Sequence, residues 1–357
     1  MPPFLQFLVR RFLVIPLTLL VITMLLYGGV MLTPVEARAQ IYMPNTNAKL
    51  TEDQIAKLMG NIIERYHLHE PYLVQYSYWV GTFFDGTWGY SPSLNEQVLP
   101  ALLTRTPATA ELTLFSLLFI IIPFGLYAGI IAGWHRGYRD SIFQSVAFFV
   151  TSIPPFILAL AFLVIFYINL GWFAPERLGI QYSYEVTKNT FASPTGMLLV
   201  DSLINGRYDI FIDTLRHLAM PALTLSLYHW ATLARITRSA IITQRRKEYI
   251  ISAQARGIPA GRVLWRHVFR NILVPSLTSV GLSAASLITG VYVVEIIYNL
   301  NGVSEIITTA MFSGIPDAPA ILGFAVYSVL VVLILMFLLD VIQAVVDPRI
   351  HEDMIKP

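Results

Sequence analysis

Five stretches of the chain contain no Asp, Glu, Lys or Arg and are long enough to cross a membrane. They cover residues 12–35, 112–134, 141–175, 271–294 and 318–339. About 20 mostly apolar residues span a bilayer as a helix, because every backbone polar group must be bonded within its own segment. The third stretch is too long for one crossing, and we expect its helix to end near Leu170. A sixth and shorter stretch, 218–234, contains His229 and also predicts a helix.

The composition agrees with several membrane crossings. Hydrophobic residues make up 55% of the chain and charged residues 13%, with a mean hydropathy of +0.62. A soluble domain has about 25% charged residues. We therefore predict an all-α membrane protein with six transmembrane helices. The first apolar stretch, which follows Arg10-Arg11, is too long for the core of a signal peptide and is interpreted as a retained helix.

Lys and Arg residues predict the orientation of the chain, since they accumulate in cytoplasmic loops. If both termini are cytoplasmic, most of the Lys and Arg residues lie on the cytoplasmic side of the membrane. Two substantial segments, 34–107 and 171–216, are then outside. The first has a helical pattern over 52–66, followed by the aromatic stretch 72–90, and predicts a small folded cap. The composition of the second does not predict a structure.

The sequence contains no recognisable catalytic motif. A phosphate-binding G-x-x-x-x-G-K-[ST] loop, an H-E-x-x-H pair and a G-x-S-x-G elbow are all absent, and there is no cysteine. His67-Leu68-His69-Glu70 is the nearest approach to a metal site, but no third ligand is evident. Glu111, Glu295 and Asp340 lie at the ends of apolar stretches, which disfavours an ion relay. We expect no catalytic residue, no metal and no cofactor in this chain.

The basic segment 235–271 is the most informative part of the sequence. Small residues, Ala253 and Ala255, allow a short helix to lie close to another surface, and Glu248 suits the N-terminal end of its dipole. Gly257 suits a left-handed helix stop, and Pro259 suits the first turn of a second helix. The segment predicts a helix-turn-helix that lies along the membrane and docks on a cytosolic partner.

The spacing of Glu248, Ala253, Ala255 and Gly257 resembles the E-A-A-G loop in membrane permease subunits of bacterial and archaeal ABC importers. The chain looks like the first permease subunit of the dipeptide/oligopeptide/nickel family over nearly its whole length. The matching positions include Arg10-Arg11, Trp88-Gly89, Arg105-Thr106-Pro107, Ser152-Ile153-Pro154, Gly171-Trp172-Phe173, Arg235 to Ser239, Arg270-Asn271, Asp317 and Asp347-Pro348-Arg349. One departure is Gln254-Ala255-Arg256-Gly257, where the family usually has R-A-K-G.

This resemblance implies a type I ABC importer permease fold with an extracytoplasmic insertion between helices 1 and 2. The expected organisation is an N-terminal tail and helix 1 (1–33), a cap region (34–107), a permease core (108–346) and a cytoplasmic tail (347–357). The coupling loop of the core is 235–271.

The resemblance also implies the partners. They are a second, related permease subunit, two cytosolic ATPase subunits that bind ATP and Mg²⁺, and an extracytoplasmic substrate-binding protein. The expected location is the bacterial or archaeal cytoplasmic membrane, with both termini in the cytoplasm and no nucleic-acid partner. ATP closes the ATPase pair, and the coupling loop turns that closure into helix movement.

Two sets of residues are expected to carry this coupling. The predicted ATPase interface comprises Glu248, Tyr249, Ala253, Ala255, Arg256, Gly257, Ile258 and Val263. The residues predicted to brace the loop are Arg238, His267, Arg270 and Asn271. An alternative is that His267, Arg270 and Asn271 only satisfy helix ends or lipid headgroups.

The sequence does not identify the transported substrate. Peptides are the leading hypothesis, and oligosaccharides or nickel are alternatives within the same machinery. A stand-alone secondary transporter or channel would need a midplane ion site, and a membrane-embedded hydrolase would need a nucleophile paired with a base.

Overall fold

The structure is a computed structural model that describes residues 3–41, 51–135, 137–188, 191–313 and 317–346. The predicted tail 347–357, with Asp347-Pro348-Arg349, lies outside the described residues. The chain divides into two compact units. We call residues 1–8, 108–301 and 335–357, as far as they are described, the core unit. Residues 9–107 and 302–334 form the cap unit.

Helices account for nearly all the regular structure, which confirms the predicted all-α class. In chain order the α-helices are α1 (Pro3–Val30), α2 (Val35–Ile41), α3 (Glu52–Arg65), α4 (Tyr72–Phe84), α5 (Val98–Phe115), α6 (Ile122–Trp134), α7 (Tyr138–Ser152), α8 (Pro155–Phe162), α9 (Ile180–Val186), α10 (Leu198–Ile204), α11 (Tyr208–Arg245), α12 (Glu248–Ala255), α13 (Ala260–Arg262), α14 (Phe269–Tyr298), α15 (Ser304–Phe312) and α16 (Ala318–Val346). Strands β1 (Tyr90–Ser91) and β2 (Glu96–Gln97) form an antiparallel hairpin. Three π-helical segments, η1 (Ser116–Ile121), η2 (Leu163–Asn169) and η3 (Val263–Val268), continue neighbouring helices.

Four helical segments of the described chain are long and apolar enough to span a membrane. They are Leu8–Val30, Val98–Trp134, Ala260–Tyr298 and Ala318–Ile342. They correspond to four of the five long stretches predicted from the sequence, and the first ends at Val30 and not at residue 35. The sixth prediction, 218–234, is helical as expected, but it belongs to the 38-residue helix α11, which is not among these segments.

The prediction of one helix over the third stretch is wrong. Asp140–Ser152 and Pro155–Asn169 are two helices bent by 97° with respect to each other, as a broken span or a re-entrant pair. The cause is the Pro154-Pro155 pair, because proline lacks an N–H and pushes the residue before it out of the α region. Ile153 accordingly has an extended backbone, with φ −95° and ψ 123°. The expected end near Leu170 is confirmed, since η2 ends at Asn169.

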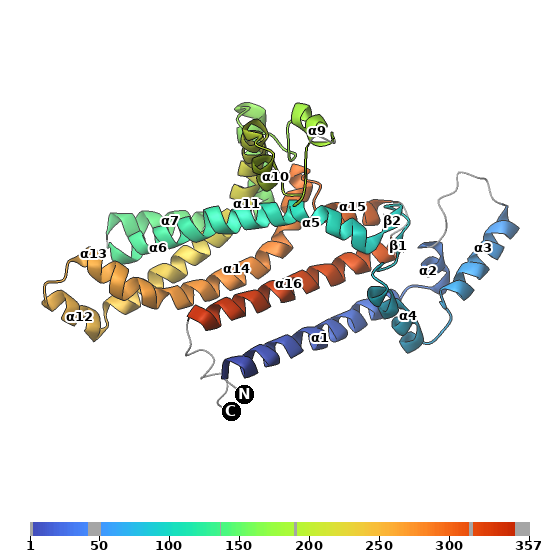
Figure 1. Cartoon of the computed structure of the whole chain (residues 1–357), viewed down its shortest axis with the longest axis horizontal. Helices are drawn as coiled ribbons and strands as arrows, with labels where there is room; N and C mark the ends of the chain where they lie inside the picture. Colours follow the sequence, from blue (N-terminus) through green and yellow to red (C-terminus); the bar gives the residue numbers. More distant parts are fainter. Residues whose placement is uncertain (1–2, 42–50, 136, 189–190, 314–316, 347–357) are drawn as a thin grey trace. The chain divides into compact units, whose positions relative to one another are not determined.

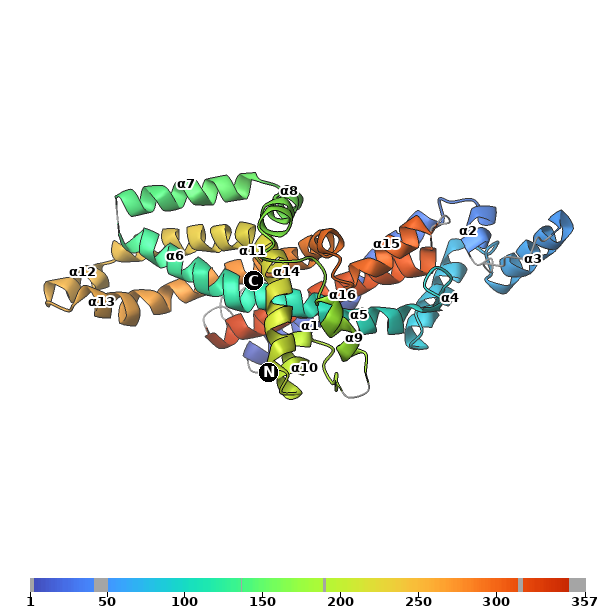
Figure 2. The same ribbon diagram turned by 90° about the horizontal axis from the view of Figure 1, so that it is seen from above.

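In the core unit, α11 is the central helix. It packs against α6 and α14, and the three run alongside one another (Figure 1). Helix α7 lies along α6 and α11, and α8 turns away at the end of α7 (Figure 2). A large buried cluster joins α5, η1, α8, α11 and α14 through apolar side chains that include Leu112, Ile121, Leu225, Leu287 and Tyr298.

Three glycines on one face of α6 allow α11 to approach its backbone. Gly125, Gly129 and Gly133 recur every four residues and therefore share a helix face. A Cβ at Gly129 would lie 2.6 Å from the carbonyl oxygen of Ala234 and 2.6 Å from the Cβ of Thr237. Such contacts are shorter than real Cβ contacts, so only glycine fits. Small residues serve close helix packing of this kind within membranes.

The segment 171–216, for which the sequence predicted no structure, folds onto the N-terminal part of α11. Leu178, Phe191, Leu198 and Ile210 form its small buried cluster. Glu111 of α5 is 5% exposed and holds the segment, because it pairs with Arg177 at 2.8 Å and accepts the backbone N–H of Leu199 at 2.6 Å. The carboxylate thus joins α5 to two points of the segment.

The cap unit contains the predicted helix 52–66, observed as α3 at Glu52–Arg65. Gln54 Oε1 accepts the N–H of Thr51 at 3.0 Å and satisfies one free donor at its start. The aromatic stretch forms α4, whose rings pack on the end of α1: Tyr27 stacks on Trp79 with a centroid distance of 5.0 Å. The described part of 34–107 is therefore folded, as the sequence predicts, whereas its place outside the membrane stays a prediction.

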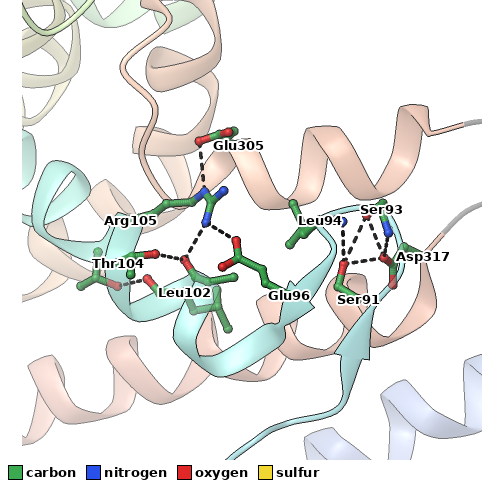
Figure 3. A network of polar contacts seen from close by, with 11 residues as sticks. Ser91, Ser93, Leu94, Glu96, Leu102, Thr104, Arg105, Glu305 and Asp317 are labelled. Carbon is green, nitrogen blue, oxygen red and sulfur yellow. Dashed lines mark hydrogen bonds and ion pairs between the residues drawn. The ribbon is translucent and has the colours of Figure 1, made fainter. Parts of the chain in front are cut away.

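Carboxylates connect the β-hairpin of the cap unit to its helices (Figure 3). Arg105 of α5 donates to Glu96 at 2.9 Å and to Glu305 at 3.1 Å. Asp317 precedes α16, and its Oδ2 accepts the hydroxyls of Ser91 and Ser93 at 2.6 and 2.7 Å. Its Oδ1 accepts the N–H of Ala320 at 3.1 Å, so the same side chain also caps the helix.

The close approach of α6 and α11 predicts a specific sensitivity. Gly129→Ala should lower the free energy of unfolding by about 1–3 kcal/mol, because the added methyl group forces the backbone of α11 to shift. Thermal unfolding of the purified chain in detergent measures this change. The matched control is Gly290→Ala in α14, where the new Cβ would meet Leu225 at an ordinary 3.7 Å. Equal melting temperatures for the two variants would contradict the packing.

Candidate functional site

The basic segment folds as a hairpin of α12 and α13, as the sequence predicts. Glu248 is the first residue of α12. Gly257 ends the helix with a left-handed backbone, at φ +76°. The Gly257 N–H bonds to the Gln254 carbonyl and the Ile258 N–H to the Ala253 carbonyl, which is the Schellman arrangement. Pro259 precedes α13 as its cap residue, one position earlier than the predicted first turn.

One face of the hairpin forms its own small core. Ile250, Ala253, Val263 and Leu264 are buried together with Ile241 of α11 and with Ile130, Val268 and Ile272. Ile258 is half-buried against the same cluster. Ala253 and Val263, which the sequence predicted as interface residues, therefore shape the hairpin from inside. A larger side chain at Ala253 would push α12 away from this core.

The opposite face of the hairpin is exposed. It carries Glu248, Ala255, Arg256 and Gly257. Three large side chains also lie on the surface of this segment, namely Tyr249, Ile251 and Trp265, which are 42%, 55% and 60% exposed. Ile251 and Trp265 were not among the predicted site residues. Large side chains such as these indicate an interaction surface only once the structure shows which helix face is exposed.

The predicted bracing residues act in different places. Asn271 Nδ2 donates to the Tyr249 hydroxyl at 2.9 Å and to the His267 carbonyl at 2.9 Å. Tyr249 in turn donates to Gln244 at 2.7 Å, so Asn271 connects the start of α14 to α12 and the end of α11. His267 contributes its backbone carbonyl, and its side chain is half-buried. Arg270 is exposed.

Arg238 lies outside the hairpin and joins α11 to the start of α7. Its Nε and Nη2 donate to the two oxygens of Asp140 at 2.6 and 2.7 Å. The two side chains are 23% and 17% exposed. These hydrogen bonds raise the pKa of the Arg238 guanidinium. Because arginine is charged throughout the physiological pH range, the contact with Asp140 is an ion pair.

A second arginine in this region was missed by sequence reasoning. Arg245, at the end of α11, donates to the last carbonyls of α6, at 2.7 Å to Trp134 and 3.3 Å to Gly133. Its guanidinium also lies 5.1 Å from the centre of the Trp134 ring. The sequence shows three adjacent cations, Arg245, Arg246 and Lys247, and nothing in it distinguishes the one that caps α6.

The motif His67-Leu68-His69-Glu70 shows no metal-binding geometry in the described chain. No group of three His, Cys, Asp or Glu residues among the described residues is arranged to hold a metal ion. His67 instead stacks flat on Tyr78, with a centroid distance of 4.3 Å.

Several long apolar helices and an exposed hairpin define this chain as a multi-pass membrane protein. Residues 121–352 match the family described as "binding-protein-dependent transport system inner membrane component". The chain is 32% identical to the dipeptide transport system permease protein of Alkalihalophilus pseudofirmus, over 84% of this chain and 88% of that protein. It is also 32% identical to the di/tripeptide transport system permease protein of Pseudomonas aeruginosa, over 83% and 85%. The oligopeptide transport system permease protein AppB of Bacillus subtilis is 32% identical over 81% and 84%.

The chain therefore belongs to the family of binding-protein-dependent transport system inner membrane components. This confirms the family resemblance seen in the sequence. The family is one of transport permeases and not of enzymes.

The ion pair between α7 and α11 predicts a measurable coupling. Arg238→Gln and Asp140→Asn should each reduce the free energy of unfolding by about 1–3 kcal/mol, because each leaves a partly buried group without its partner. The double variant should lose less than the sum of the two single variants. Denaturation of the four proteins in detergent measures the coupling. Arg235→Gln, at an exposed cation on the same helix, is the control, and strict additivity would contradict a direct pair.

Proposed function

We propose that this chain is a permease subunit of an ATP-driven, binding-protein-dependent importer of peptides. It forms half of the translocation pathway with a second, related permease. The peptide cargo is supported by three relatives whose names specify dipeptide, di/tripeptide and oligopeptide transport. Oligosaccharides and nickel are carried by the same kind of machinery, but no observation on this chain favours them.

The exposed face of the α12–α13 hairpin is the observation that supports coupling to ATPase subunits. Tyr249 and Ile251 of α12 and Trp265 of η3 are exposed, and so are the charged Glu248 and Arg256. Exposed large apolar side chains within a charged segment favour an interaction surface. Ala255 and Gly257 leave room there for the partner to come close. The partners are two cytosolic ATPase subunits that bind ATP and Mg²⁺.

The hairpin is also connected in a way that can transmit force. Ala260–Tyr298 is one continuous helical segment, so a push on α13 acts on the whole of α14. On the other side, Ile250 and Val263 are buried against Ile241 of α11. Closure of the ATPase pair would thus move α11 and α14 together, as a rigid-body transition between two states of the pathway.

The number of membrane crossings and the side on which each segment lies are part of the same proposal. We assign six crossings, counting the bent α7–α8 pair as one and α11 as the sixth. Both termini and the hairpin are then cytoplasmic, and the cap region 34–107 and the segment 171–216 face outside. An extracytoplasmic binding protein delivers the cargo there, in a bacterial or archaeal cytoplasmic membrane.

Ala255→Trp tests the docking surface. Ala255 is exposed, so the larger side chain should leave the fold intact and obstruct the partner. We expect co-purification of the ATPase subunits to fall by roughly tenfold or more. ATP hydrolysis stimulated by the peptide-loaded binding protein should fall with it. Ala192→Trp, at an exposed alanine in the segment 171–216, is the matched control.

Two results would count against this proposal. Unchanged co-purification and hydrolysis in Ala255→Trp would remove the hairpin from the ATPase interface. Stimulation of hydrolysis by a binding protein loaded with oligosaccharide or Ni²⁺, and not with peptide, would replace the cargo.

The orientation can be tested with single cysteines, because the natural chain contains none. Ser252→Cys, on the exposed side of α12, should react with a membrane-impermeant maleimide only after the cells are opened. Ser183→Cys, which is exposed in α9, should react in intact cells. The reverse pattern would overturn the assigned topology.

A further inference from the structure

A cavity of about 700 Å³ lies within the cap unit. Its wall includes the end of α1, the helices α2 and α4, and the residues around β1. Aromatic rings form much of this wall, among them Tyr27, Tyr78, Trp79 and Trp88. Sites for small organic ligands have volumes of about 300–1,000 Å³ and mostly apolar walls with a few polar groups. The cavity has the size and lining of such a site.

Two arginines line this cavity, the exposed Arg65 and the buried Arg38. Arg38 is only 5% exposed. Its Nη1 donates to Gln75 Oε1 at 2.7 Å and to Met31 Sδ at 3.0 Å, and its Nη2 donates to the Leu68 carbonyl at 3.3 Å. All these acceptors are uncharged. The Nε–H has no acceptor among the described residues.

The position of Arg38 is fixed by its surroundings. Gln75 is 2% exposed, and its amide nitrogen donates to the carbonyls of Leu68 and Glu70 at 3.0 and 2.5 Å. This orients the Gln75 oxygen toward the guanidinium. A side chain held in this way loses little conformational entropy when a ligand binds.

A buried guanidinium without a carboxylate is unfavourable, because uncharged acceptors replace only part of its lost hydration. The missing negative charge can come from a ligand in the cavity. A carboxylate is the natural group, since it accepts charge-assisted hydrogen bonds from arginine. The aromatic wall then takes the apolar body of the ligand. Asp85, an exposed carboxylate that also lines the cavity, suits a positive group of the ligand.

We propose that this cavity is a binding site for a small carboxylate with an apolar or aromatic body, of the size of a di- or tripeptide, and that Arg38 pairs with the carboxylate. The identification of the ligand as a peptide rests on the proposed function, whereas the recognition of a carboxylate rests on Arg38 and the cavity. The site belongs to the cap unit and is separate from the ATPase-docking hairpin.

The experiment uses the full chain in nanodiscs of uncharged phosphatidylcholine, without its partners. Calorimetry measures binding of the tripeptide Ala-Phe-Ala and of the same peptide with a C-terminal amide. We expect saturable binding of the free acid and at least tenfold weaker binding of the amide. Arg38→Gln should weaken binding of the acid at least tenfold. Lys57→Gln removes a cation from the exposed face of α3, outside the cavity lining, and should leave binding unchanged.

A second variant covers the case in which Arg38→Gln fails to fold. Thr82 lines the cavity, and its hydroxyl donates to the Trp79 carbonyl one turn earlier. Thr82→Phe should fill part of the cavity, leave the bonds of Arg38 in place and weaken binding of the acid. Equal affinities for acid and amide, or undiminished binding in both variants, would overturn the proposal. So would the absence of saturable binding to the natural chain.

An anionic lipid is the competing occupant, because its phosphate can also pair with Arg38. Nanodiscs containing phosphatidylglycerol test this source. Loss of tripeptide binding in them, together with Arg38-dependent retention of the lipid on purification, would replace the peptide by a lipid. None of these measurements involves an ATPase, so their failure leaves the docking proposal intact. Failure of the Ala255→Trp experiment likewise leaves the cavity unaffected.

Discussion

The core unit depends on the close approach of two helix backbones. Gly125, Gly129 and Gly133 remove every Cβ from one face of α6, and the side chains of Leu233 and Ile241 with the Ala234 carbonyl occupy that space. Membrane helices gain little from the hydrophobic effect between themselves, so packing of this kind has to hold them together. The same approach brings the end of α11 to the end of α6, where Arg245 can reach the free carbonyls of Gly133 and Trp134. The glycines thus favour both this cap and the buried cluster that Ile130 and Ile241 share.

The α12–α13 hairpin extends this arrangement beyond the helix bundle. Ile241 is common to both, since it packs against Gly133 of α6 and also belongs to the buried cluster of the hairpin. Small residues have two different effects here. Ala253 is small because it is buried between the hairpin and α11. Ala255, two residues later, is exposed, and its small side chain leaves room for a partner on the outer surface. The repeated alanine of the loop therefore reflects internal packing at one position and accessibility at the other.

The sequence predicted what depends on a single segment. Charge-free stretches located the long helices, and Gly257 located the end of α12, because both signals are local. The prediction failed for the stretch 141–175. Its lack of charged residues indicated one helix and did not show the bend at Pro154-Pro155. The prediction also failed where two segments had to be known together. The α6 glycines, the choice of Arg245 among three cations, and the exposure of Trp265 all depend on which surface lies opposite, and a single chain read in order does not show this.

The arginines of the described chain show why Arg38 differs from the residues that only hold the fold together. Arg105, Arg177 and Arg238 are partly buried, and each meets a carboxylate: Glu96 and Glu305, Glu111, and Asp140. Arg245 meets carbonyls, but these are the terminal carbonyls of α6, where the helix dipole supplies negative charge. Arg38 is more deeply buried than the three paired arginines, and it meets an amide oxygen, a thioether and a loop carbonyl. The fold compensates these four partly buried arginines internally and leaves the more deeply buried Arg38 to uncharged groups on the wall of a cavity, which is the electrostatics of a site completed by an anion from outside.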